Sequence, residues 1–211
     1  AEIQKHFSYP VYVEYGANAA GFGTVWRSKE LKDAVYVIVT NNGVAGSIIL
    51  NNEIYHGRAG RAGAFGHITL NPSGRKCFCG ACGCWSAYNA LNALTGLDET
   101  DLDGFFEKVN NEDPDAIAKW DEYLTYFADG LSTVSMSFDI DIVIGGPLAV
   151  YLEPWLDTII SKMQSRPTLN GENISIHLDT KSESPMAEGV ALMIVAKFLN
   201  DELDNFRFDE L

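Results

Sequence analysis

Apolar residues along the chain follow two spacings, which predict strands and helices. The continuous β-branched and aromatic run at 35–39 is typical of a strand buried on both faces of a sheet, and a second buried strand is predicted at 140–144. Asn51-Asn52 separates two further apolar segments and predicts a tight hairpin turn. The shorter predicted strands lie at 9–14, 47–50, 53–55 and 174–178.

Helical spacing is clearest in the middle of the chain, where apolar residues recur at intervals of three and four. This stripe predicts a helix with one face on the core and consists of Ile117, Trp120, Leu124, Phe127, Leu131 and Val134. Further helices are predicted at 17–27, 85–95, 98–109, 152–163 and 185–199. A strand-rich start followed by alternating helices and strands predicts an α/β fold, whose mixed sheet combines an antiparallel hairpin with later parallel strands.

The composition narrows the possible partners. With 211 residues, of which 46% are hydrophobic, the chain can bury a substantial core, which argues against disorder. Its formal net charge of −14 argues against direct binding to nucleic acid or to an anionic membrane. No apolar run reaches the length of a membrane span, and the amino terminus lacks the apolar centre of a secretion signal. Clustered cysteines in a sequence without a secretion signal favour a location in the reducing cytoplasm.

The cysteines form one cluster, which carries the most specific chemistry in the sequence. All four lie within residues 77–84, and His67 precedes them by ten positions. Several thiolates and an imidazole in one segment are the ligands of a closed tetrahedral zinc site, and Gly80 and Gly83 permit the sharp bend that such a site needs. A run of reduced cysteines or a strained local disulfide is the alternative. Spacing alone also allows Cys79 and Cys82 to share one metal.

The order of these residues resembles the signature of the ROK family, which contains sugar kinases and sugar-responsive transcriptional repressors. The family signature is Gly-His, a spacer, and Cys-x-Cys-Gly-x-x-Gly-Cys, and here Gly66-His67 is followed by the cysteine segment at 77–84. Further segments resemble the family in the same order, at 13–20, 38–46, 142–146 and 187–191. The resemblance extends over nearly the whole chain.

The resemblance implies a fold, a metal and a domain layout. The expected fold is a ribonuclease H-like (actin/hexokinase-type) mixed sheet flanked by helices, at 31–211, with a zinc-binding loop at 67–84. Residues 1–30 would be the remnant of the first lobe and the connection between lobes, because the family's Asp-x-Gly-Gly-Thr loop has no counterpart here. A structural Zn²⁺ is implied, with Cys82 as the spare thiol and with the ligands His67, Cys77, Cys79 and Cys84.

Four positions depart from the family in a way that removes polar groups from its sugar pocket. Gly16 stands where the family's kinases have the aspartate that acts as general base, and Tyr15 stands where an asparagine binds sugar hydroxyls. Ala64 and Ser86 replace two glutamates. His67 remains, and the metal would occupy it. Losing one charged acceptor costs about 1.5–3 kcal/mol, so the changed pocket is expected to bind the usual hexose poorly and to lack kinase activity.

These observations predict the effector-sensing and dimerisation domain of a ROK-type transcriptional regulator of sugar metabolism that does no chemistry. Its expected partners are a second copy in a homodimer and a sugar or another small metabolite. It would reach DNA only through an amino-terminal module absent from this chain, and no membrane partner is expected.

Two other functions compete with this one. The first is a sugar kinase acting on a hexose or amino sugar with a displaced base, for which Glu14 or Glu53 is the candidate. The second is a zinc-stabilised interaction module without a small ligand. In that case an exposed tryptophan would serve as the anchor, and the candidates are Trp26, Trp85, Trp120 and Trp155.

Overall fold

A mixed sheet forms the centre of the protein. The computed structural model describes residues 2–96, 101–171, 173–182 and 184–205. Within them the sheet has the strand order β3-β2-β1-β4-β5, in which β1–β2 and β2–β3 are antiparallel while β1–β4 and β4–β5 are parallel. The strands are β1 (Ala34–Thr40), β2 (Gly43–Leu50), β3 (Glu53–Ile54), β4 (Asp141–Gly145) and β5 (Ile176–Asp179).

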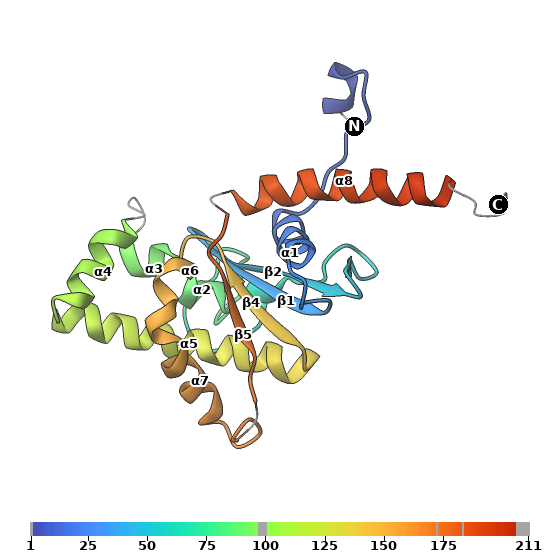
Figure 1. Cartoon of the computed structure of the whole chain (residues 1–211). Coiled ribbons are helices and arrows are strands. Elements are labelled where there is room, and N and C mark those ends of the chain that lie inside the picture. The colour runs from blue at the N-terminus through green and yellow to red at the C-terminus, as the bar shows by residue number, and fades with distance from the viewer. Residues whose placement is uncertain (1, 97–100, 172, 183, 206–211) are drawn as a thin grey trace.

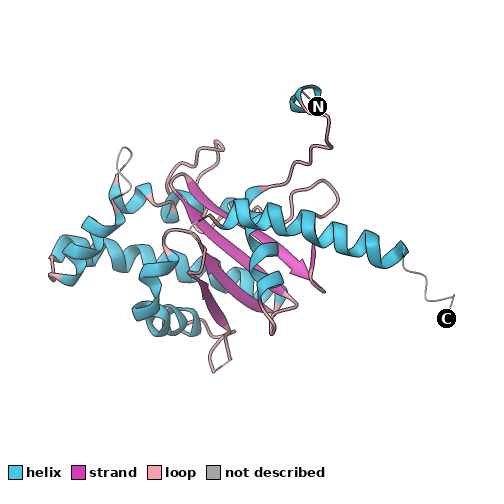
Figure 2. Ribbon diagram, turned by 45° about the horizontal axis from the view of Figure 1, so that its top comes forward, coloured by secondary structure: helices cyan, strands magenta, loops and turns pink. Residues whose placement is uncertain are grey.

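Helices cover both faces of the sheet (Figures 1 and 2). On one face α1 lies against the strands, and α8 lies across the outside of α1 (Figure 1). On the other face α5 is the longest helix and α7 packs beside it. The helices and 3₁₀ segments are η1 (Ile3–His6), α1 (Gly16–Arg27), η2 (Phe65–His67), α2 (Ser86–Asn89), α3 (Asn92–Thr95), α4 (Leu102–Asn110), α5 (Pro114–Phe138), α6 (Ala149–Leu152), η3 (Glu153–Trp155), α7 (Leu156–Gln164) and α8 (Pro185–Asn205).

Strand β1 is buried on both sides, which accounts for its unbroken apolar run. Val35, Val37 and Val39 point to the larger core, which α5 completes, whereas Tyr36 and Ile38 point to the smaller core under α1. The predicted hairpin after β2 is confirmed, because Asn51 and Asn52 have φ angles of 53° and 64°, the left-handed conformation of a two-residue turn between twisted strands.

The long central helix is confirmed as well. Asp113 caps its first turn by accepting a hydrogen bond from the Ala116 backbone N–H at 2.9 Å, and Pro114 follows at the first helical position. Five of the six residues in the predicted stripe are buried, but Ile117 is exposed because it lies in the first turn, at the edge of the core.

Four sequence predictions differ from the structure. No strand forms at 9–14, where the exposed backbone has no neighbouring strand and is held by hydrogen bonds to the side chain of Gln4 instead. The helix predicted at 85–95 is interrupted at Ala90, because the next two backbone N–H groups bond to carbonyls of the β1–β2 turn. The last strand, β5, begins two residues later and ends one residue later than predicted. The helix predicted from 98 begins at Leu102, and its first predicted residues fall outside the described ones.

The tryptophans divide between core and surface. Trp85 and Trp120 are completely buried, and Trp155 packs edge-on against Trp120. Trp26 is exposed and stacks on Phe22, so it is the one tryptophan of the described residues with a surface position.

The contact between α1 and α8 requires glycine. A Cβ atom at Gly189 would lie 1.8 Å from the Ala19 carbonyl oxygen, and one at Gly23 would lie 2.9 Å from the Gly189 Cα atom. We expect Gly189→Ala to lower the free energy of unfolding by about 1–3 kcal/mol, although alanine favours helices by ~1 kcal/mol over glycine. Urea denaturation measures this, with Ala118→Ser on the exposed side of α5 as control. A stabilised Gly189→Ala variant would contradict the close packing.

Candidate metal centre and the altered ligand pocket

The segment from His67 to Cys84 folds into a compact loop on the edge of the sheet. Isolated β-bridges join Thr69 to Cys84 and Lys76 to Cys82. A tight turn between them is closed by hydrogen bonds from the Cys77 backbone N–H to the Ala81 carbonyl at 2.8 Å and from the Gly80 N–H to the Cys77 carbonyl at 3.0 Å. Gly80 has φ 94°, the conformation that this turn needs.

The carboxyl-terminal end of the loop is anchored in the core. Trp85, which directly follows the last cysteine, is fully buried, and a Cβ atom at Gly130 of α5 would lie 2.0 Å from its ring. Arg75 pairs with Glu122 at 2.9 Å and lies over the ring of Tyr88. The loop is therefore held against α5 from two sides.

Four side chains of this loop bring their ligand atoms together. The nitrogen of His67 and the sulfurs of Cys77, Cys79 and Cys84 all lie within 4.8 Å of one another. Cys79 Sγ is 3.7 Å from Cys84 Sγ, and Cys77 Sγ is 3.9 Å from His67 Nδ1. With metal–sulfur bonds near 2.3 Å, a tetrahedron separates two sulfurs by roughly 3.8 Å, so this donor set fits one tetrahedral ion. Cys82 is exposed and lies outside the group.

The neighbouring thiols of Cys79 and Cys84 differ in acidity. Burial, together with hydrogen bonds with Cys79 and Cys77, raises the pKa of the Cys84 thiol to about 12. Cys79 is exposed, and hydrogen bonds from the Ala81 backbone and from Cys77 lower its pKa. A metal would bind the thiolate form of both, so binding has to release the proton from Cys84.

Of the five positions predicted for the sugar pocket, Ser86 lines the smaller of the two cavities described below, and the other four line neither of them. Tyr15 precedes α1 and is exposed, and Ala64 precedes η2 and is exposed. At Gly16, the first residue of α1, an added Cβ atom would lie 2.7 Å from Met186 Sδ, so a side chain of α8 fills that space. His67 belongs to the cysteine group instead.

Ser86 makes a structural contact. It is buried, and its Oγ accepts a hydrogen bond from the Val44 backbone N–H at 3.0 Å. The space around this hydroxyl is small, because a Cβ atom at Gly43 or Gly66 would lie within 2.7 Å of it. The hydroxyl therefore fastens the start of β2 to α2.

Glu14, the first candidate for a displaced base, is already engaged. Its carboxylate accepts hydrogen bonds from the Tyr15 N–H at 2.7 Å and from Asn18 at 2.8 Å, and it pairs with His56 at 2.8 Å. Burial raises the pKa of Glu14, but these hydrogen bonds outweigh it, so the pKa lies below its ordinary value. A carboxylate held in its charged form is a weak proton acceptor. Glu53, the second candidate, is exposed at the start of β3.

Two cavities of substantial size lie near the β1–β2 turn. The larger, about 860 Å³, runs from this turn past Gly146 to the start of α8, where Met186 lines it. The smaller, about 500 Å³, lies between the turn and the cysteine loop and includes Lys76, Phe78 and Ser86. Among the described residues that line the larger cavity there is no arginine, lysine or histidine, and the one charged residue is Asp179.

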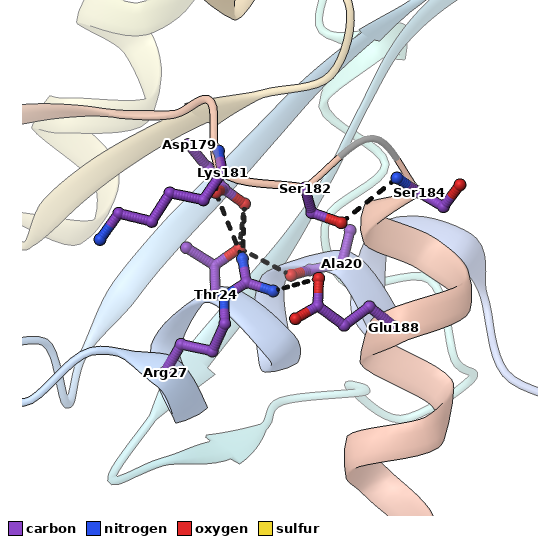
Figure 3. Close-up of polar contacts among 8 residues, drawn as sticks. All are labelled: Ala20, Thr24, Arg27, Asp179, Lys181, Ser182, Ser184 and Glu188. Atoms are coloured by element: carbon purple, nitrogen blue, oxygen red, sulfur yellow. Dashed lines mark hydrogen bonds and ion pairs between the residues drawn. The ribbon is translucent and has the colours of Figure 1, made fainter.

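Asp179 ends β5 and belongs to a polar cluster that joins three elements (Figure 3). Its carboxylate is buried, accepts a hydrogen bond from the Thr24 hydroxyl and lies 3.2 Å from Nη2 of Arg27, both in α1. Nη1 of Arg27 lies 2.6 Å from Glu188 of α8. A hydrogen bond from Ser182 and the nearby Arg27 guanidinium hold the pKa of Glu188 below its ordinary value.

The sequence analysis did not predict this cluster. Asp179 is the last residue of β5, and Arg27 lies in the last turn of a helix that has no other charged residue. Charged residues at such places are a signal of pairing, but they lie 152 positions apart, so their contact needs the three-dimensional fold.

Comparison with known proteins decides the family. A sequence model of the ROK family matches residues 1–190.

The chain belongs to the ROK family.

Relatives of both functional types occur among the similar ROK proteins. The xylose repressor of Bacillus subtilis (strain 168) is 33% identical over 81 residues, which make up 38% of this chain and 21% of the repressor. The N-acetylmannosamine kinase of Haemophilus influenzae (strain PittEE) is 29% identical over 177 residues, which make up 80% of this chain and 58% of the kinase. The matched parts thus span well under two thirds of these relatives.

The solved structures show the fold. A ROK hexokinase from Thermus thermophilus matches with a TM-score of 0.75 at 24% identity, covering 92% of this chain and 69% of the hexokinase. The mixed α/β sheet with flanking helices is thus that of the ROK sugar kinases, as predicted. None of the helices among the described residues is long and apolar enough to cross a membrane.

The Asp179 cluster generates a prediction about stability in this ROK protein. Asp179→Asn removes a buried charge that faces Arg27, so we expect it to lower the free energy of unfolding by about 3 kcal/mol. Glu188 contacts the same arginine but is 39% exposed, so Glu188→Gln is a matched control expected to cost less than about 1 kcal/mol. Urea denaturation of both variants measures the difference, and equal losses would show that burial of Asp179 does not matter.

Proposed function

We propose that the chain is the effector-sensing and dimerisation domain of a ROK-type transcriptional regulator of sugar metabolism, and that it is catalytically inactive. One observation carries this proposal. The position at which ROK kinases are expected to hold their general base is Gly16, and Met186 occupies the space beside it. Phosphoryl transfer to a sugar hydroxyl needs a group that accepts the proton, and glycine has none.

The charge of the larger cavity supports the same proposal. A nucleoside triphosphate carries several negative charges, which a kinase neutralises with cationic side chains and magnesium. The described residues that line this cavity supply no cation, and the Asp179 carboxylate adds a negative charge. The similarity to the xylose repressor of Bacillus subtilis (strain 168) also favours a regulator.

We further propose that His67, Cys77, Cys79 and Cys84 hold a structural Zn²⁺. Four protein ligands complete a tetrahedron and leave no open position for water or substrate, so the ion would stabilise the loop and take no part in a reaction. The free thiols of the described residues suit a reducing cytoplasm, where the protein is proposed to act.

The proposal includes partners and a domain layout. Residues 1–30 would be the remnant of the first lobe and the connection, and 31–211 the second lobe. The effector would be a sugar or another small metabolite, and the domain would form a homodimer. Binding would shift the population of two conformations, and DNA would be reached through an amino-terminal module outside this chain.

A sugar kinase is the second candidate. The N-acetylmannosamine kinase of Haemophilus influenzae (strain PittEE) matches 80% of this chain, a longer match than that of the repressor, and this observation favours it. The base would then be Glu14 or Glu53. A zinc-stabilised interaction module is a third candidate, and exposed Trp26 would be its anchor.

The first test separates the regulator from the kinase. With Mg-ATP and a panel that contains xylose, glucose and N-acetylmannosamine, we expect no sugar-dependent formation of ADP, because no base is in place. In the same panel at least one compound should raise the melting temperature. Sugar-dependent ADP formation that Glu14→Gln or Glu53→Gln abolishes would establish the kinase instead, and a protein that no metabolite stabilises would favour the interaction module.

The second test concerns the metal. The purified chain should contain about one zinc ion, and Cys84→Ser should lose it, because three ligands do not complete the tetrahedron. We expect the melting temperature of Cys84→Ser to fall by roughly 10 °C, since metal binding contributes to folding. Cys82→Ser is the matched control and should keep both the ion and the stability. Zinc lost equally from the two variants would reject this ligand set.

A further inference from the structure

The three cysteines of the candidate metal centre differ in their access to solvent. Cys77 and Cys84 are buried, whereas Cys79 is exposed. Cys79 lies inside the tight turn that the hydrogen bond from the Gly80 backbone N–H to the Cys77 carbonyl closes. A small oxidant in solution can therefore reach the sulfur of Cys79 directly, while the protein shields the other two sulfurs of the group.

Cys84 is placed to form a disulfide with Cys79. Their sulfurs lie 3.7 Å apart, so a bond needs a further approach of the two side chains. A Cβ atom added at Gly80 would have no contact within 4 Å, so the chain beside Cys79 has open space around it. The chain beside Cys84 is tightly packed, because a Cβ atom at Gly83 would lie 1.6 Å from the Asn71 carbonyl oxygen. Cys79 is thus the partner that can move.

The fourth cysteine points to another side of the loop. Cys82 forms an antiparallel bridge with Lys76, and the next pair inward is joined by a hydrogen bond from the Cys77 N–H to the Ala81 carbonyl. Successive residues of paired chains point to opposite sides, so Cys82 shares a side with Lys76, and Cys77 points the other way. Cys82 is therefore an exposed thiol that does not face the sulfur of Cys77.

We propose that Cys79 and Cys84 form a peroxide-sensitive switch, in which oxidation joins their sulfurs and releases the metal. The Cys79 thiolate attacks one oxygen of hydrogen peroxide, the O–O bond breaks and hydroxide leaves, which gives a sulfenic acid. The Cys84 thiolate then attacks the Cys79 sulfur, the S–O bond breaks and a second hydroxide leaves. The two sulfurs lose two electrons to the peroxide, and two protons from solvent convert the hydroxides to water.

The inference rests on the proposed zinc site and adds its regulation. A disulfide removes two of the four proposed ligands, and His67 and Cys77 alone do not complete a tetrahedron, so the ion would be released. The same loop lines the smaller cavity through Lys76, Cys77 and Phe78. Oxidation would therefore also change the shape of a candidate ligand site.

The test treats the zinc-loaded 211-residue chain with hydrogen peroxide and follows zinc release with a chromogenic chelator. About one zinc ion per chain should be released, and peptide mapping by mass spectrometry should find a disulfide between Cys79 and Cys84. Dithiothreitol with added zinc should restore the ion. Hydrogen exchange of the amides at 68–83 should become at least ~10-fold faster on oxidation, since no helix or strand holds these residues.

The matched control is Cys82→Ser, which removes the other exposed thiol of the loop and should release zinc within about two-fold of the wild-type rate. Four results would overturn the switch and leave the structural zinc site standing. These are a disulfide that includes Cys82 or Cys77, zinc release that Cys82→Ser abolishes, zinc retained after Cys79 is oxidised, and unchanged amide exchange in the loop. A chain that binds no zinc when reconstituted would overturn the zinc site and the switch together.

Discussion

One imidazole and three thiols lie within 4.8 Å of one another, and the conformation of the loop from His67 to Cys84 depends on this contact. The residues between His67 and Cys84 form no regular element beyond two isolated bridges, so the loop has little secondary structure of its own to hold it. The packing of Trp85 in the core and the contacts among the His67 nitrogen and the three cysteine sulfurs set the position of the loop. In this account the metal preserves the shape of the loop independently of any reaction.

The proposed function places the changed ligand residues beside contacts that hold the fold. Gly16 faces a methionine, Ser86 fastens β2 to α2, and the described residues that line the larger cavity include an acid and no base. None of these contacts disturbs the packing of the sheet. If the pocket has lost its sugar, as proposed, the core and the cysteine loop can remain as they are, because they depend on contacts among the protein's own residues.

The sequence predicted the features that depend on local spacing. The buried strand at 35–39, the Asn51-Asn52 turn and the central helix follow from apolar periodicity and turn chemistry, and the cysteine group follows from an unusual density of ligands. The strand predicted at 9–14 failed because a strand needs a neighbour, which spacing cannot supply. The Arg27–Asp179 pair was missed because it joins distant segments, and the filling of the space at Gly16 by Met186 depends on where α8 lies.

The most direct test of the central claim is X-ray absorption spectroscopy at the zinc edge on the purified chain. The account predicts a four-coordinate ion with three sulfur ligands near 2.3 Å and one nitrogen ligand at about 2.0–2.1 Å, and no oxygen ligand from water. Four sulfur ligands would show that Cys82 replaces His67. A light-atom ligand from solvent would show an open site suited to chemistry, and either result would contradict a closed structural centre built from His67, Cys77, Cys79 and Cys84.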